Sequence, residues 1–149
     1  LVIGCGNELR GDDALGPRVA EAVAALRRPG VRAIACQQLL PEMAAVIANA
    51  RTVLFVDVIA APGVSSVQIK PIVPAAARPA LNHIGNSESP LALARDVFGE
   101  CPPAWTIAIP ASNFGLGDPI SAAAERGAAQ ALRFVNEIHL PIDSGLPRG

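Results

Sequence analysis

The stretch that decides the fold is Gly4-Cys5-Gly6-Asn7-Glu8-Leu9-Arg10-Gly11-Asp12-Asp13-Ala14-Leu15-Gly16. The apolar run before it is typical of a buried strand, and a helix is predicted to start near Gly16-Pro17. A glycine-rich turn between a strand and a helix usually binds phosphate. This turn instead carries Glu8, Asp12 and Asp13, with Arg10 as its only cation. Carboxylates repel phosphate and attract cations, so the turn favours a metal or other cation as its ligand.

The composition indicates one globular domain over residues 1–149, with a Pro- and Gly-rich tail from about residue 140 that we expect to be loosely held. About half of the residues are hydrophobic (51%), which excludes a disordered chain. The formal net charge is −1 and Lys70 is the only lysine, so the basic surface of a nucleic-acid-binding protein is missing. No apolar run is long enough to cross a membrane.

Three cysteines, Cys5, Cys36 and Cys101, are widely spaced and form no CxxC motif. This pattern favours the reducing cytoplasm over a disulfide framework. Cys5 would need a nearby base to act as a nucleophile, so we interpret all three as packing residues. The chain begins with Leu1 rather than Met, and we expect that a short segment precedes it.

Strand and helix signals alternate along the chain, which predicts the α/β class: a three-layer, mostly parallel twisted sheet with helices on both faces. The segment 64–73 has alternating polarity and could add one antiparallel strand. Two helices are predicted to begin with a cap followed by proline, at Ser89-Pro90 and Asp118-Pro119. The other expected strands are 1–5, 31–36, 52–58 and 105–109, and the expected helices are 17–26, 41–50, 90–98 and 119–138.

Two acidic segments are expected to meet at the carboxyl edge of the sheet. In a flavodoxin-like order the first and third strands are neighbours, and ligands bind beyond their ends. That order brings the Asp12-Asp13 loop beside Asp57, which follows the apolar run 53–56. A buried carboxylate needs a partner. Asp57 could instead accept backbone hydrogen bonds, and Asp12 or Asp13 could complement the helix dipole while the other binds a ligand.

His83 is the third candidate ligand, in a loop before the helix predicted at Ser89-Pro90. A lone loop histidine is often only a surface residue, and the second histidine, His139, fits a dipole-complementing or tail position. One imidazole and two carboxylates would suit a divalent ion. Other catalytic templates fail: Leu9 breaks GxGxxG, Asp12 replaces the P-loop lysine, and GxSxG is absent.

The combination of these features resembles the hydrogenase maturation proteases, over nearly the whole chain. It comprises a strand leading into GxGNxLxGDDxxG, an apolar strand ending in Asp57, a loop with His83, and the helix after Ser89. A late Gly115-Leu116-Gly117 precedes the last helix. Ala14 replaces a glycine that many relatives carry after the acids.

The resemblance implies an endopeptidase that removes the C-terminal extension of a [NiFe]-hydrogenase large-subunit precursor after nickel insertion. It implies that Asp13, Asp57 and His83 contact the metal and take part in catalysis. The nickel would be carried by the substrate, and cadmium or zinc could substitute for it in crystals. The metal, or an acid such as Asp13, would activate a water or polarise the scissile carbonyl. We expect a cytoplasmic monomer.

Two other classes of function stay open from the residues alone. A nucleotide-binding module would use the same sheet topology and the Gly4-x-Gly6 turn, although Leu9 and the acids count against it. A noncatalytic maturation chaperone would bind the nickel-loaded precursor without cutting it.

Overall fold

The computed structural model describes residues 1–60, 62–72 and 88–138. Within them, five strands form one sheet in the order β2-β1-β3-β5-β4. The strands are β1 (Val2–Cys5), β2 (Ala33–Cys36), β3 (Val53–Ala60), β4 (Gln68–Pro71) and β5 (Ala104–Ala111). The first and third strands are neighbours, as the sequence predicted.

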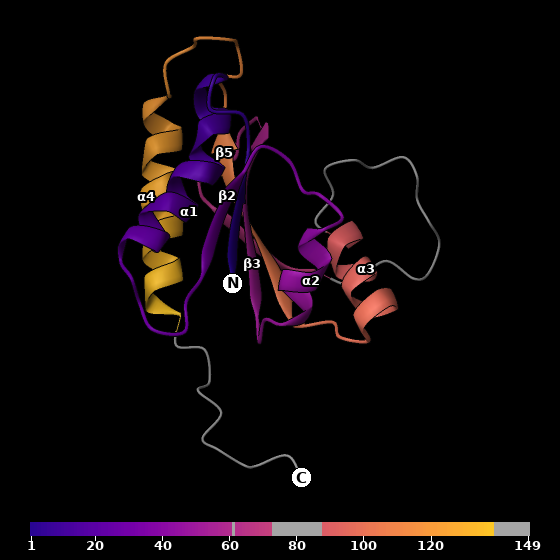
Figure 1. Cartoon of the computed structure of the whole chain (residues 1–149). Helices are drawn as coiled ribbons and strands as arrows, with labels where there is room; N and C mark the ends of the chain where they lie inside the picture. Colours follow the sequence, from indigo (N-terminus) through magenta and orange to yellow (C-terminus); the bar gives the residue numbers. More distant parts are fainter. Residues whose placement is uncertain (61, 73–87, 139–149) are drawn as a thin grey trace.

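Helices cover both faces of this sheet, which confirms the predicted three-layer α/β class (Figure 1). α1 and α4 lie on one face, and α2 and α3 lie on the other. Their bounds are α1 (Leu15–Ala25), α2 (Met43–Ala48), α3 (Glu88–Phe98) and α4 (Ala122–Glu137); a short 3-10 helix, η1 (Gly11–Ala14), precedes α1. None of the helices in the described part of the chain is long and apolar enough to cross a membrane.

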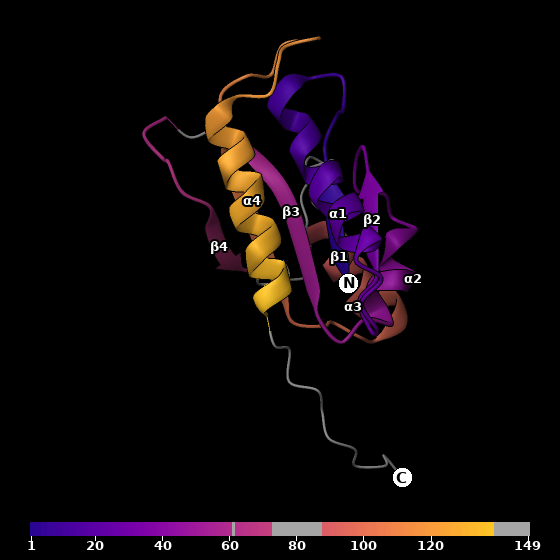
Figure 2. The ribbon, with the colours of Figure 1, turned by 90° about the vertical axis from the view of Figure 1, so that its left-hand side faces the viewer.

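Four of the strands run parallel, and β4 pairs antiparallel with β5 at one edge of the sheet (Figure 2). The extended segment expected over 64–73 therefore supplies the antiparallel strand, although only Gln68–Pro71 is regular. The long central strand β3 is buried over its first four residues, which explains its continuous apolar sequence.

Each face of the sheet has its own hydrophobic core, because successive strand residues point to opposite faces. Leu54 and Val56 of β3 pack in the cluster that contains α1 and α4 residues. Phe55 packs in the second cluster, with Ile47 of α2 and Leu91 of α3. Asp57, two residues after Phe55, therefore falls on the α2–α3 face of the sheet.

Two glycines let the start of α1 lie directly against the strands. A β-carbon on Gly4 would clash with the backbone of Gly16, and one on Gly16 would clash with the carbonyl oxygens of Cys5 and Val56. Only glycine fits at these contacts. The close approach brings the turn before α1 down onto the carboxyl ends of β1 and β3.

The predicted start of the last helix was wrong. α4 begins at Ala122, and its cap is Ser121, whose hydroxyl accepts a hydrogen bond from the Ala124 N–H. Asp118 instead closes a turn within the preceding loop, where its carboxylate accepts the Gly115 N–H at 2.7 Å. Both Asp118 and Ser121 are residue types that can cap a helix. Ser121 is the one used, and its N–H and hydroxyl are also hydrogen-bonded to the Asp12 carboxylate. α3 begins one residue before the expected cap, at Glu88.

Candidate functional site

Asp57 lies within β3 rather than at its end, because pairing with β5 continues as far as Ala60 opposite Ala111. On the other side of β3 the ladder stops earlier: its last pair is Gly4 with Val56, and β1 ends at Cys5. Asp57 is thus the first β3 residue beyond that ladder. The residue is partly buried there.

The carboxyl group of Asp57 is held in an environment that disfavours its charge. Burial, above all, raises the pKa of Asp57, the Val58 N–H lowers it, and the negative charge of Asp13 raises it, so that the pKa stands at about 6. That N–H donates to the carboxylate at 2.7 Å. Among the described residues no lysine or arginine forms an ion pair with Asp57. A partly buried acid without a cation is typical of a ligand-binding group.

Asp13 approaches the same place from the glycine-rich turn. Its carboxylate accepts the backbone N–H of Asn7 at 2.9 Å, and the Asn7 side chain in turn accepts the Leu9 N–H at 2.9 Å. Gly6 has a φ of 151° and leaves no space for a β-carbon beside the Asp13 backbone. The turn is therefore folded around Asp13, whose charge reaches Asp57. The expected convergence of these two acids is present.

Asp12, by contrast, is fully buried and structural. Its carboxylate accepts hydrogen bonds from the backbone N–H groups of Ser112, Asn113 and Ser121 and from the Ser121 hydroxyl, at 2.6 to 3.0 Å. Burial raises the pKa of Asp12, but these hydrogen bonds outweigh it and hold the pKa below its ordinary value. Asp12 ties the turn to both ends of the loop between β5 and α4.

His83, the third predicted ligand, lies outside the described residues, so its role stays a prediction. Among residues 1–60, 62–72 and 88–138, no three His, Cys, Asp or Glu side chains are grouped so that they could hold a metal ion. Asp13 and Asp57 thus supply two carboxylates at most from this part of the chain. Two are too few for a tight metal site of their own, and a metal bound there would need further ligands.

A thiol pair beside Asp57 was missed as a pair by the sequence reasoning. Cys5 and Cys36 are register partners on β1 and β2, and their sulfurs are 3.0 Å apart. The mutual hydrogen bond, then burial, raises the pKa of Cys5, while the same bond lowers the pKa of Cys36. A signal was available, because both of the predicted strands 1–5 and 31–36 end on a cysteine.

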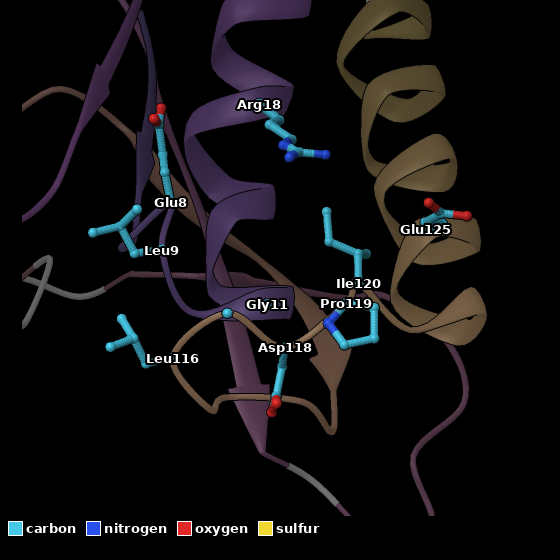
Figure 3. A pocket seen from close by; sticks show the side chains of 10 residues that line it. Glu8, Leu9, Gly11, Arg18, Leu116, Asp118, Pro119, Ile120 and Glu125 are labelled. Carbon is cyan, nitrogen blue, oxygen red and sulfur yellow. The ribbon is translucent and has the colours of Figure 1, made fainter.

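A pocket of about 780 Å³ lies on the other side of the turn, between the turn and the loop before α4 (Figure 3). Leu9 and Leu116 are exposed at it, by 66% and 74%, and the Gly117 N–H donates to the Leu9 carbonyl oxygen. Its other lining residues are Glu8, Gly11, Arg18, Gly117, Asp118, Pro119, Ile120 and Glu125. Neither Asp13 nor Asp57 lines it, so the carboxylate pair, rather than this hollow, is the candidate reaction site.

Comparison with solved structures gives a consistent set of neighbours. The [NiFe] hydrogenase maturation protease HycI from Thermococcus kodakarensis is 23% identical, with a TM-score of 0.70 over 91% of this chain and 88% of that one. The hydrogenase maturating endopeptidase HybD from E. coli is 21% identical, with a TM-score of 0.62 over 90% and 87%. The hydrogenase 2 maturation peptidase from a Thaumarchaeota archaeon is 20% identical, with a TM-score of 0.65 over 91% and 94%.

No family model matches the sequence, and no curated protein sequence matches it either. At 20–23% identity the likeness establishes the fold. The resemblance expected from the glycine-rich turn is thereby confirmed at that level: this chain has the α/β fold of the hydrogenase maturation proteases, along nearly its whole length.

Proposed function

We propose that the protein is an endopeptidase that removes the C-terminal extension of a [NiFe]-hydrogenase large-subunit precursor once nickel has been inserted. The observation that carries the proposal is that Asp13, in the turn packed on the carboxyl ends of β1 and β3, lies near enough for its charge to raise the pKa of Asp57. Its support from outside the site is the fold shared with solved structures that are named as hydrogenase maturation proteases.

The chemistry of the pair suits a metal that arrives with the substrate. Asp13 and Asp57 offer oxygen ligands and leave the remaining positions to His83 and to the precursor's own groups. Burial and, to a lesser extent, the negative charge of Asp13 raise the pKa of Asp57, and a divalent cation would offset both effects. Binding at this edge would place the precursor's C-terminal segment over the sheet, where the metal or Asp13 assists attack of water on the scissile carbonyl.

The alternatives fit the arrangement less well. A nucleotide would bring phosphate to the edge where Asp13 and Asp57 present negative charge, and the turn's N–H of Asn7 is already taken by Asp13. A noncatalytic chaperone would use the same surface, and it differs from a protease only in leaving the precursor whole. We further propose that the protein is a monomer and that it works in the cytoplasm, where [NiFe]-hydrogenase precursors would receive their metal.

The test is cleavage of a nickel-loaded precursor, followed by mass spectrometry. The wild-type protein should release the C-terminal peptide, while Asp13→Asn, Asp57→Asn and His83→Gln should each lower the rate by about 100-fold or more, since they remove metal contacts. Glu100→Gln changes an exposed acid away from the site and should leave the rate unchanged. Normal cleavage by all three variants would show that the site is misassigned. Binding without cleavage by the wild type would indicate the chaperone.

A further inference from the structure

We propose that Cys5 and Cys36 are a redox-active dithiol that forms a reversible disulfide beside Asp57, with a small disulfide such as oxidised glutathione as the oxidant. The proposal does not depend on the function proposed above. It rests on how the ends of β1 and β2 place the two thiols.

The geometry is close to that of a disulfide before any bond forms. Cys5 and Cys36 are direct register partners, and adjacent strands are about 4.8 Å apart, within the range of Cα separations that disulfides span. Their sulfurs, 3.0 Å apart, already point at each other. Bond formation requires them to approach by only about 1 Å, to the usual sulfur–sulfur bond length.

The two thiols differ in access, which assigns the order of reaction. Cys36 lines a pocket of about 360 Å³ together with residues 6–9, Pro17, Glu21, Ala35 and Gln37. Both cysteines are partly buried and pack against the core under α2 and α3, but Cys5 is not among the residues that line this pocket. An oxidant in the pocket therefore meets Cys36 first.

The reaction balances as two thiol–disulfide exchanges. The Cys36 thiolate attacks one sulfur of oxidised glutathione, which forms a mixed disulfide and releases one glutathione thiolate. Cys5 then loses its proton and attacks the Cys36 sulfur, which forms the Cys5–Cys36 bond and releases the second glutathione. Two protein thiols are oxidised, and one glutathione disulfide is reduced to two thiols.

The test uses the full chain in glutathione buffers of increasing oxidised fraction, with free thiols then blocked by an alkylating reagent. Trypsin cuts after Arg10, Arg32 and Arg51, so the bond would join peptide 1–10 to peptide 33–51, while Cys101 lies in peptide 96–126. We expect loss of alkylation at Cys5 and Cys36, an intact mass lower by two hydrogens, full reversal by dithiothreitol, and continued alkylation of Cys101.

Two variants sharpen the result. Cys36→Ser should abolish the cross-link, and Cys101→Ser should leave it unchanged. The proposal is overturned if both thiols stay alkylated in the fully oxidised buffer, if Cys36 stops at the mixed disulfide with glutathione, or if Cys101 is linked as readily as Cys36. Circular dichroism on each variant confirms that the protein assayed is folded.

Discussion

Replacing Asp57 by Asn should make the protein more stable at neutral pH. The pKa of Asp57 rises from its ordinary value of 3.8 to about 6, chiefly through burial. At about 1.4 kcal/mol per pKa unit, keeping this carboxylate ionised in the folded state costs up to about 3 kcal/mol. Asparagine has the same shape, carries no charge, and can still accept the Val58 N–H, so it removes the cost and keeps the hydrogen bond.

The sign of the pH dependence follows from the same pKa. Between about pH 4 and 6 the folded protein binds more protons at Asp57 than the unfolded chain does, so this residue's contribution to stability falls as the pH rises through that window. The cost is complete above about pH 6 and absent below about pH 4. The stability gained by Asp57→Asn should therefore be largest near pH 7.5 and should vanish toward pH 4.

The assay is urea unfolding of both proteins at pH 7.5 and pH 4.5, with Glu100→Gln as a control for loss of an exposed acid. The variant is expected to gain up to about 3 kcal/mol at pH 7.5, while the control changes by less than about 0.5 kcal/mol. A variant that is less stable than the wild type at pH 7.5 would refute the reasoning, because it would show that the Asp57 charge is compensated within the fold.

Three further outcomes follow from the site and its supports. Asp12→Asn should destabilise the protein by about 3 kcal/mol in urea unfolding, because an amide cannot accept from all of the donors that surround this buried carboxylate; unchanged stability would contradict that role. Gly16→Ala should lower the melting temperature by about 5 °C or more, since its β-carbon meets the Cys5 and Val56 carbonyls; a normal melting curve would show that α1 can move away from the sheet. If the wild-type protein cleaves the precursor as proposed, kcat/KM for that cleavage should fall as the pH drops through about 6, where Asp57 takes up a proton; a profile that stays flat down to pH 5 would remove Asp57 from substrate recognition.

Strong local signals made much of the fold predictable. The apolar run 53–56, the glycine-rich turn and the proline after Ser89 each indicated an element that the structure contains. The neighbouring positions of β1 and β3 followed from the α/β topology, and with them the approach of Asp13 to Asp57. The regular topology of the fold thus made it possible to predict that Asp13 and Asp57 approach each other, although more than forty residues separate them in the sequence.

Contacts between distant segments were not predictable in the same way. The local pattern left Asp12 and Asp13 equivalent, the family resemblance pointed to Asp13 as the ligand, and the Ser112, Asn113 and Ser121 donors show that Asp12 is the buried one. The same contact moved the start of α4 from Asp118-Pro119 to Ser121, because the hydroxyl of Ser121 both binds Asp12 and caps the helix. The local sequence does not determine whether Asp118 or Ser121 caps the helix, because Ser121 is held by hydrogen bonds to Asp12, which is distant in the sequence.

The proposed function depends on recognition, by the carboxylate pair, of nickel held by the precursor. Its most direct test is the mass of the precursor after incubation with the wild-type protein, with and without nickel inserted beforehand. We expect loss of the C-terminal peptide from the nickel-loaded precursor alone, and no loss when the folded Asp57→Asn variant replaces the wild type. Equal cleavage of the nickel-free precursor would contradict it.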